Sequence, residues 1–200
     1  MLVGMAKQTY HHGDLRRALL DAAAEAIEES GPAALSLRDL ARRAGVSHAA
    51  PTHHFGDKKG LLTALATEGF GQLAAALEET RAATGSFLEL GVTYVRYAVT
   101  HRAHFEVMFQ PDLFHGDDPA LDAASTLAYE ALYAGVAELP DGAGTNVREV
   151  GLAGWSMAHG FATLWLSGAL PQTTEDPDTA ARAVLRQLTE QTRGSDDRKA

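Results

Sequence analysis

The chain has 200 residues, of which 46% are hydrophobic and 22% are charged, a balance typical of one or two small globular domains. It has no cysteine and no apolar run long enough to span a bilayer, which excludes disulfides, thiolate metal sites, cysteine nucleophiles and a membrane-spanning helix, and favours the cytoplasm. The net charge of -9 is unevenly spread, because residues 1–60 hold eight Lys/Arg against seven Asp/Glu, whereas residues 61–200 hold nine against 19.

The first part of the chain predicts an arm followed by a helix. Residues 1–9 show no hydrophobic periodicity, so we expect a flexible arm. Apolar residues then recur at helical spacing from about residue 14 to residue 30, and Gly31-Pro32 ends the pattern. This first helix is expected to pack with the two short helices that follow into a three-helix unit.

Two short helices with a glycine turn between them fit the segment 35–55. Ser36 and Asp39 have the spacing of a capping box at the start of the first helix. Gly45 lies where a left-handed residue is needed, and Ser47 is placed to cap the second helix. This is the pattern of a helix-turn-helix whose second helix reads DNA, although an ordinary pair of core helices joined by a glycine turn has the same spacing.

The sequence Gly-Val-Ser at 45–47, followed by His-His-Phe at 53–55, Lys58 and Leu61-Leu62, resembles the TetR/AcrR family of transcriptional regulators. The resemblance covers roughly residues 10–63. It implies a DNA-binding domain that combines the first helix with the helix-turn-helix. It also implies a homodimer that binds a palindromic DNA operator, with half-sites about 34–36 Å apart or a multiple of that.

The second helix of the motif, predicted over 47–54, is expected to enter the major groove, where alanine methyls can meet a thymine methyl. The backbone N–H groups after Phe55, with Lys58 beside them, predict an anion site for a phosphate. Pro51-Thr52 departs from the Leu-Tyr pair of many family members, whose tyrosine touches a phosphate; Ala-Ala-Pro resembles the variant of one branch. The predicted DNA contacts are Ser36, Ser47, His48, Ala49, Ala50, Thr52, His53, His54 and Lys58.

The rest of the chain predicts helices only, without strand-like alternation or internal repeats. The predicted helices span about 58–82, 86–100, 102–109, 119–138, 145–168 and 177–193, with a possible helical turn at 112–114 and a disordered tail at 194–200. We therefore predict an all-α fold of about nine helices. Its expected domains are a helix-turn-helix domain at 10–56 and a regulatory and dimerisation domain at 57–193, joined by the connecting helix 58–82.

Two apolar stripes predict a dimer interface. Small residues recur every three or four positions on one predicted helix, and the last helix has an apolar stripe of its own. Two such helices from each of two chains can form a four-helix interface, which the family resemblance also implies, although the same stripes would fit packing within one chain. The predicted dimerisation residues are Gly151, Gly154, Ala158, Ala162, Ala181, Val184, Leu185 and Leu188.

Aromatic residues of the second part suggest an apolar pocket for a small-molecule effector. Trp155, His159 and Gly160 form a Trp-x-x-x-His-Gly signature that resembles a C-terminal domain of one branch of the family. The histidine either contacts a ligand or is a buried side chain bonded to a neighbouring helix. The predicted ligand-binding residues are Tyr94, Phe105, Met108, Phe109, Tyr129, Tyr133, Trp155 and His159.

The resulting hypothesis is a cytoplasmic, homodimeric repressor that a small-molecule effector of unknown identity releases from DNA. We expect no enzymatic activity, no cofactor, no membrane partner and no metal, since His101 and His104 have no evident third ligand. One rival is a helical enzyme that uses His159 with an acidic partner. The other is a helical adaptor whose first 60 residues bind protein, which salt-dependent DNA affinity would distinguish.

Overall fold

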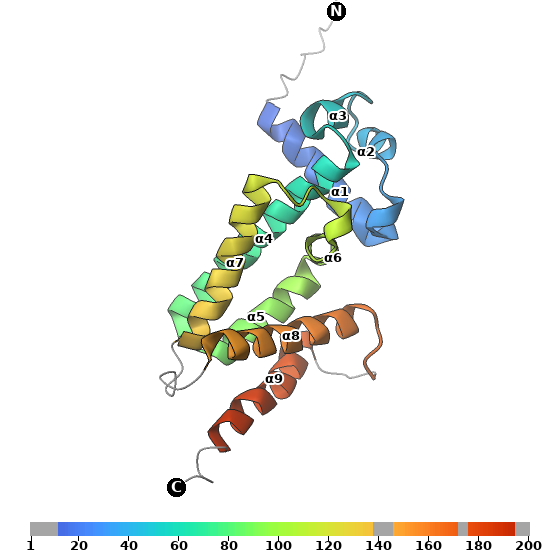
Figure 1. Ribbon diagram of the computed structural model, residues 1–200. Helices are drawn as coiled ribbons and strands as arrows, with labels where there is room; N and C mark the ends of the chain where they lie inside the picture. The colour runs from blue at the N-terminus through green and yellow to red at the C-terminus, as the bar shows by residue number, and fades with distance from the viewer. Residues whose placement is uncertain (1–11, 138–145, 172–175, 195–200) are drawn as a thin grey trace, which may run out of the picture.

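The computed structural model of the chain describes residues 12–137, 146–171 and 176–194, and the side chains within 15–136, 146–171 and 176–187. These ranges form nine α-helices and one short 3₁₀ helix without any strand, so the predicted all-α fold is confirmed (Figure 1). The predicted arm at 1–9 and residues 195–200 of the predicted tail lie outside the described part. None of the described helices is both long and apolar enough to cross a bilayer.

The first three helices form a compact head (residues 12–55), which lies at one end of the molecule (Figure 1). They are α1 (His12–Ala34), α2 (Leu37–Arg43) and α3 (Ala50–Phe55). The helical backbone of α1 is interrupted at Gly31, which has φ 76°, so the predicted stop at Gly31-Pro32 marks a real break. Leu19, Ala23 and Leu40 meet at the centre of the head and are at most 1% exposed. The predicted apolar face of the first helix therefore builds the core of the head.

The remaining helices form the body (residues 58–194), and their starts follow from polar side chains that cap them. Asp57 accepts the Gly60 N–H at 2.8 Å at the first of these helices, and Asp118 accepts two N–H groups at the start of the helix Pro119–Ala137. The helices are α4 (Lys58–Thr84), α5 (Phe87–Thr100), α6 (Arg102–Met108), the 3₁₀ helix η1 (Pro111–Leu113), α7 (Pro119–Ala137), α8 (Val147–Leu166) and α9 (Pro177–Gly194).

The body is organised around α4 and α5. α4 runs from the head along α7, while α5 packs against α8 and α9 at the far end (Figure 1). Leu90, Val92 and Val95 of α5 are completely buried, and Arg96 of α5 binds Asp178 of α9 at 2.7 Å. The short helix α6 lies where the body meets the head, because it packs against both α1 and α4. Any change in the body that moves α6 therefore alters its contact with α1 of the head.

Candidate functional site

The turn between α2 and α3 has the predicted geometry. Gly45 has φ 66°, a left-handed conformation in which a side chain would be strained. Its N–H donates to the Arg42 carbonyl at 3.2 Å, and the Val46 N–H donates to the Ala41 carbonyl at 3.0 Å. Val46 is half-buried against the core of the head. These bonds close the end of α2 and direct the chain towards α3.

The predicted capping box at the start of α2 is wrong. Ser36 occupies the N-cap position, but its side chain makes no capping hydrogen bond. Asp39 instead binds Arg42 at 2.6 Å and Arg43 at 2.8 Å, which holds the pKa of the Asp39 carboxyl below its ordinary value. A carboxylate beside two guanidinium groups gains more from charge-assisted bonds than from a backbone N–H. Ser36 is thus left exposed, with its hydroxyl available to a ligand.

The second helix of the motif begins at Ala50, later than the predicted start just after a Ser47 cap. Ser47 does not cap it through its side chain, and only the Ser47 carbonyl takes part, by accepting the Ala50 N–H at 3.0 Å. Pro51 is the second residue of α3, where its missing N–H costs little. The chain before α3 is therefore a turn that presents its side chains individually.

One face of this segment is exposed and the other is buried. His48, Ala49, Thr52 and His53 are exposed, whereas Ala50 is only 9% exposed and Pro51 is buried. The prediction that Ala50 meets the bases is therefore wrong, because its methyl group packs into the head. His54 is half-buried, with its ring centroid 5.5 Å from that of His53. The outward face of the turn and α3 together is thus defined by two imidazoles, a methyl and a hydroxyl.

The predicted anion site at the start of α4 is occupied by the protein's own groups. The Asp57 carboxylate accepts the Gly60 N–H, which holds the pKa of Asp57 below its ordinary value. Lys58 Nζ donates to the Ala33 carbonyl at 2.9 Å, so this lysine joins the start of α4 to the end of α1. A DNA phosphate would have to compete with Asp57 there, which weakens the case for this anion site.

Two positively charged residues that the sequence reasoning missed are better placed. Arg38 and Lys59 are exposed, and neither forms an ion pair with another residue in the described part of the chain. The signal was present in the sequence. Arg42 and Arg43 have Asp39 three and four residues away, whereas Arg38 and Lys59 have no acidic residue at either helical spacing. Free cations of this kind are the ones available to phosphates.

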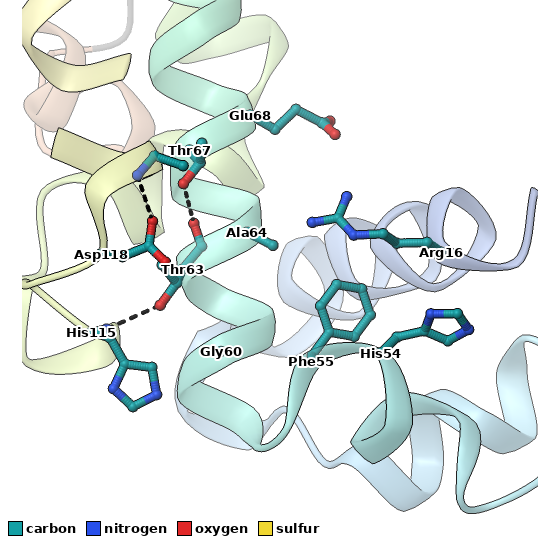
Figure 2. A pocket seen from close by; sticks show the side chains of 11 residues that line it. Arg16, His54, Phe55, Gly60, Thr63, Ala64, Thr67, Glu68, His115 and Asp118 are labelled. Carbon is teal, nitrogen blue, oxygen red and sulfur yellow. Dashed lines mark hydrogen bonds between the residues drawn. The ribbon is translucent and has the colours of Figure 1, made fainter. Parts of the chain in front are cut away.

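A cleft of about 500 Å³ separates the head from the body on one side. Figure 2 shows Arg16, His54 and Phe55 of the head on one side of α4, and His115 on the other. The Arg16 guanidinium lies 5.3 Å from the centre of the Phe55 ring. The backbone N–H of His115 donates to Thr63 Oγ1 at 3.0 Å. The carboxylates of the cleft are bonded within the protein: Asp118 caps α7 and Glu68 binds Arg17. We therefore assign no ligand to this cleft.

Glu68 of α4, at the border of this cleft, joins the head to the body. Its Oε2 accepts from Arg17 of α1 at 2.7 Å, and its Oε1 lies 3.1 Å from His104 Nε2 of α6. Burial lowers the pKa of His104, although Glu68 opposes this, so the neutral ring donates its Nε2–H to the carboxylate. Gln72 also donates to Oε1, at 3.2 Å. One carboxylate thus connects α1, α4 and α6.

A hydrogen-bonded aromatic cluster fills the centre of the body. Trp155 Nε1 donates to the Tyr94 hydroxyl at 3.1 Å, and this hydroxyl lies 2.8 Å from His159 Nδ1. Burial raises the pKa of Tyr94 and lowers that of His159, so both groups are uncharged near neutral pH. His159 is thus bonded to a neighbouring helix, because Tyr94 lies on α5, while the alternative of a ligand contact stays a prediction.

The predicted ligand-binding residues are divided among different places. Phe105, Phe109 and His159 line an outer cavity of about 380 Å³, and Phe109 also borders a much smaller inner cavity with Tyr94, Tyr129 and Trp155. Two assignments are not supported, because neither residue lines either cavity. Met108 packs against α4 at Gly69, and Tyr133 covers Gly151 of α8.

The small-residue face of α8 packs inside the chain and is not free for a partner. A Cβ at Gly151 would lie 2.2 Å from the Tyr133 ring, and one at Gly154 would lie 2.4 Å from the Phe87 ring. Ala158, Ala162, Ala181 and Leu185 are likewise buried. The dimer assignment of these six residues is therefore wrong, and the alternative of packing within one chain applies to them. Val184 is 42% exposed, and the side chain of Leu188 lies outside those described.

The described residues contain no group of three or more His, Asp or Glu side chains that could hold a metal ion. The ring of His101 stacks on that of Tyr97, with centroids 4.5 Å apart and an angle of 10° between the planes. His101 thus packs against an aromatic ring of α5.

Comparison with known proteins identifies the family. Residues 87–188, just over half of the chain, match the profile of the Tetracyclin repressor-like C-terminal domain. Residues 19–65 match that of the bacterial regulatory proteins of the tetR family. The chain belongs to the TetR family of DNA-binding transcriptional regulators. The family is one of regulators and not of enzymes, so the enzyme reading is set aside.

Individual relatives of this TetR-family protein differ in how much of the chain they share. A Rhodococcus sp. RHA1 protein of unknown function is 35% identical, with a TM-score of 0.76 over 91% of this chain and 97% of that chain. PfmR, a TetR-family regulator from Thermus thermophilus, is 24% identical, with a TM-score of 0.69 over 85% and 96%, and shows the same fold.

The curated relatives share only a short segment with this chain. The HTH-type transcriptional regulator BetI of Escherichia coli O139:H28 is 51% identical over 49 residues, which are 24% of this chain and 25% of BetI. This TetR-family chain thus matches about a quarter of the length of the curated relatives.

Proposed function

We propose that this protein is a homodimeric transcriptional repressor that binds a palindromic DNA operator and is released by a small-molecule effector. One observation carries the DNA-binding part. His48, Ala49, Thr52 and His53 form an exposed edge on a helix-turn-helix whose turn is fixed by Gly45. Such an edge fits the major groove, where side chains read base edges. The predicted domain division, with the head at 10–56 and the regulatory part at 57–193, fits this assignment.

The exposed groups divide into base and phosphate contacts. The imidazoles of His48 and His53 can donate to or accept from base edges, and the Ala49 methyl suits a thymine methyl. The hydroxyls of Ser36, Ser47 and Thr52 suit phosphate oxygens, as do the side chains of Arg38 and Lys59. Lys58 uses one of its three N–H groups for Ala33, so its others can still donate to a phosphate within reach. His54, which is half-buried, would reach the DNA only at the margin of the interface.

The dimer that we propose uses the outer faces of α8 and α9. Large apolar side chains remain exposed there: Leu152 is 48%, Leu164 is 47% and Val184 is 42% exposed. Their neighbours on these faces are small or flexible residues, among them Ala153 and Met157 of α8 and Ala183 of α9. Exposed apolar side chains on two adjacent helices suit an isologous four-helix contact. Two heads would then face the same side of a DNA duplex.

The effector would bind in the body, where the outer cavity of about 380 Å³ has the size of a small-molecule site. It is lined by Phe105, Phe109 and His159, three of the residues predicted for this role. We also propose that Trp155, His159 and Gly160 mark a branch of the family, which the bonds of Tyr94 to both Trp155 and His159 support. Because its target is DNA, the protein would act in the cytoplasm.

A binding assay tests the central claim. Full-length protein is titrated against labelled genomic fragments by gel shift and fluorescence anisotropy at several salt concentrations. We expect retardation of specific fragments and a log-linear loss of affinity with salt, because phosphate contacts release counterions. If no fragment is retarded above non-specific competitor at low salt, the DNA-binding proposal is wrong. An adaptor that binds protein through its head would give that result.

A further inference from the structure

The outer and inner cavities of the body share one wall, the side chain of Phe109. This residue directly follows α6 and is half-buried, although its neighbours Phe70, Tyr94 and Phe105 are at most 6% exposed. Its ring lies between 4.7 and 6.4 Å, centroid to centroid, from five others, those of Phe70, Tyr94, Phe105, Trp155 and His159. One side chain therefore stands between the solvent-facing cavity and the centre of the aromatic cluster.

The inner cavity is too small for a ligand while Phe109 stays in place. Its volume is about 10 Å³, room for at most one water molecule. Its walls are nonetheless almost entirely apolar and aromatic, with Leu73 and Leu132 beside the rings. Rotation of the Phe109 side chain would join this space to the outer cavity. The combined site would have a polar mouth and an apolar interior.

The mouth selects against charge. Arg102 and Glu106 both line it, but they bind each other at 2.7 Å. Gln110 donates its side-chain N–H to the Glu106 carbonyl. Because the cation and the anion of the mouth neutralise each other, neither is left to attract a charged ligand. A ligand that enters this mouth is favoured when it carries no net charge.

His159 offers one directed hydrogen bond. The Tyr94 oxygen accepts the Trp155 N–H, and its own O–H has no other acceptor among the described residues, so it donates to His159 Nδ1. The neutral ring then carries its proton on Nε2. This N–H has no partner in the described part of the chain, and His159 lines the outer cavity. An acceptor oxygen on a ligand would satisfy it.

We propose that the two cavities form one binding site for an uncharged, largely aromatic molecule that carries a hydrogen-bond acceptor. Its ring system displaces Phe109 and enters the aromatic cluster, and its acceptor oxygen takes the Nε2–H of His159. This inference deepens the proposed function, since the ligand is taken to be the effector. Binding itself is measured without DNA, so failure of the ligand site and failure of the repressor assignment are distinguishable.

Prodan, an uncharged naphthalene ketone whose emission shifts to the blue in apolar surroundings, is a suitable probe. The chain has two tryptophans, and Trp165→Phe leaves Trp155 as the only energy donor within the cluster. We expect saturable prodan binding with a blue shift and with energy transfer from Trp155. The anionic naphthalene dye 1,8-ANS is expected to bind at least about tenfold more weakly, because a bare charge is costly in an apolar site. Equal binding of the two dyes would overturn the proposal.

Two substitutions, with one control, test whether Phe109 separates two cavities of a single binding site. Phe109→Ala should tighten prodan binding about fivefold or more, because no side chain then has to be displaced. Phe114→Ala is the matched control, since Phe114 is also half-buried but lines neither cavity. Thr163→Phe, at an exposed position on the mouth, should weaken binding without disturbing the fold. Circular dichroism checks that each variant is folded. If Phe109→Ala and Phe114→Ala behave alike, or Thr163→Phe has no effect, the shared site is refuted.

His159→Phe tests the hydrogen bond separately. It should weaken prodan binding about threefold to tenfold, the range for one hydrogen bond. Binding of N-phenyl-1-naphthylamine, an uncharged dye without an acceptor oxygen, should change by less than about twofold. A parallel loss for both dyes would mean that His159 only supports the packing of the cluster, and the acceptor in the proposed ligand would then be wrong. Operator binding by the same variants, measured without dye, reports independently on the head.

Discussion

The head and the body of this protein place their polar chemistry in opposite ways. In the head, His48, Thr52 and His53 are exposed around a turn that the backbone fixes, while the apolar residues beneath them only hold the shape. In the body, the polar atoms of Tyr94, Trp155 and His159 are bonded to each other inside a ring of aromatic side chains. Under the proposed function, the head would meet a large rigid partner at its surface, and the body would enclose a small one.

The contrast extends to charge. Three arginines of the head, Arg17, Arg42 and Arg43, are paired with acidic residues. The cations left for DNA are therefore few, which predicts modest non-specific affinity and makes the shape of the exposed edge decisive. The body carries most of the negative charge of the chain, and this charge disfavours the approach of DNA from that side.

The largest effect is expected where the head meets α4. A Cβ at Gly60 would lie 1.9 Å from the Phe55 carbonyl oxygen, so Gly60→Ala forces α3 and α4 apart. We expect a loss of about 3 kcal/mol or more in the free energy of unfolding and loss of operator binding. Urea denaturation followed by circular dichroism measures it. Gly71→Ala on the same helix is the control, because its Cβ would meet nothing, and it should stabilise by up to about 1 kcal/mol. Equal stability of the two variants would refute the close approach.

The dimer face of the body gives the next largest effect. Val184→Asp places a charge on the outer face of α9, and burial of that charge in a dimer should raise the dimer dissociation constant about 100-fold or more. Sedimentation velocity over a concentration series measures this, and operator affinity should fall with it. Leu127→Asp on α7, where the native side chain is 57% exposed, is the matched control and should leave the dimer intact. The outer-face dimer is wrong if only the control dissociates, or if neither variant does.

The phosphate contacts of the head give a smaller effect. Lys59→Ala should weaken binding to all sequences alike and reduce the slope of log affinity against log salt by about 1. Arg42→Ala removes an equal charge, but Arg42 is already paired with Asp39, so the slope should change much less. Anisotropy titrations on operator and on unrelated DNA measure both. A change of sequence preference in the Lys59 variant would show that it contacts a base and not a phosphate.

The smallest effect is a pH dependence at the joint. Burial lowers the pKa of His104 below its value in the unfolded chain, so the unfolded state binds more protons as the pH falls below about 6.5. His104 therefore contributes stability that is present above that pH and is lost as the pH falls through its folded pKa. His104→Gln keeps a donor for Glu68 but does not titrate. Thermal scans at pH 7.5 and pH 5.5 measure the fall in Tm for each protein. The fall should be smaller for the variant than for the wild type, and the two falls should differ by about 2 °C or less. Parallel falls in Tm would contradict this.

Most of the fold follows from local signals in the sequence. The predicted helix limits lie close to the observed ones wherever a cap or a glycine sets them, as at Asp57, Ser86 and Gly85. Periodicity alone also identified the buried face of the first helix. These signals act over one or two turns, which is why a single sequence reveals them.

The misplaced residues depended on contacts that are distant in the sequence. The stripe from Gly151 to Ala162 indicates close approach of another helix, but not whether that helix belongs to the same chain; Phe87 and Tyr133 occupy it. The start of α3 was missed because Ser47 is a good cap by type, whereas the burial of Ala50 and Pro51 positions the helix. Met108 and Phe109 are adjacent in the sequence, and only packing decides that the second borders the cavities.

The carboxylate of Glu68 has one more consequence. Its two oxygens are occupied separately, Oε2 by Arg17 and Oε1 by both His104 and Gln72. If α6 withdraws His104, Gln72 of the same helix as Glu68 still satisfies Oε1, so no bare buried oxygen is left behind. α6 can therefore move away from Glu68 without leaving this oxygen unpaired, while Arg17 still bonds the head to α4. Gln72 is thus a spare donor, which lets the hydrogen bond between His104 and Glu68 break and re-form reversibly.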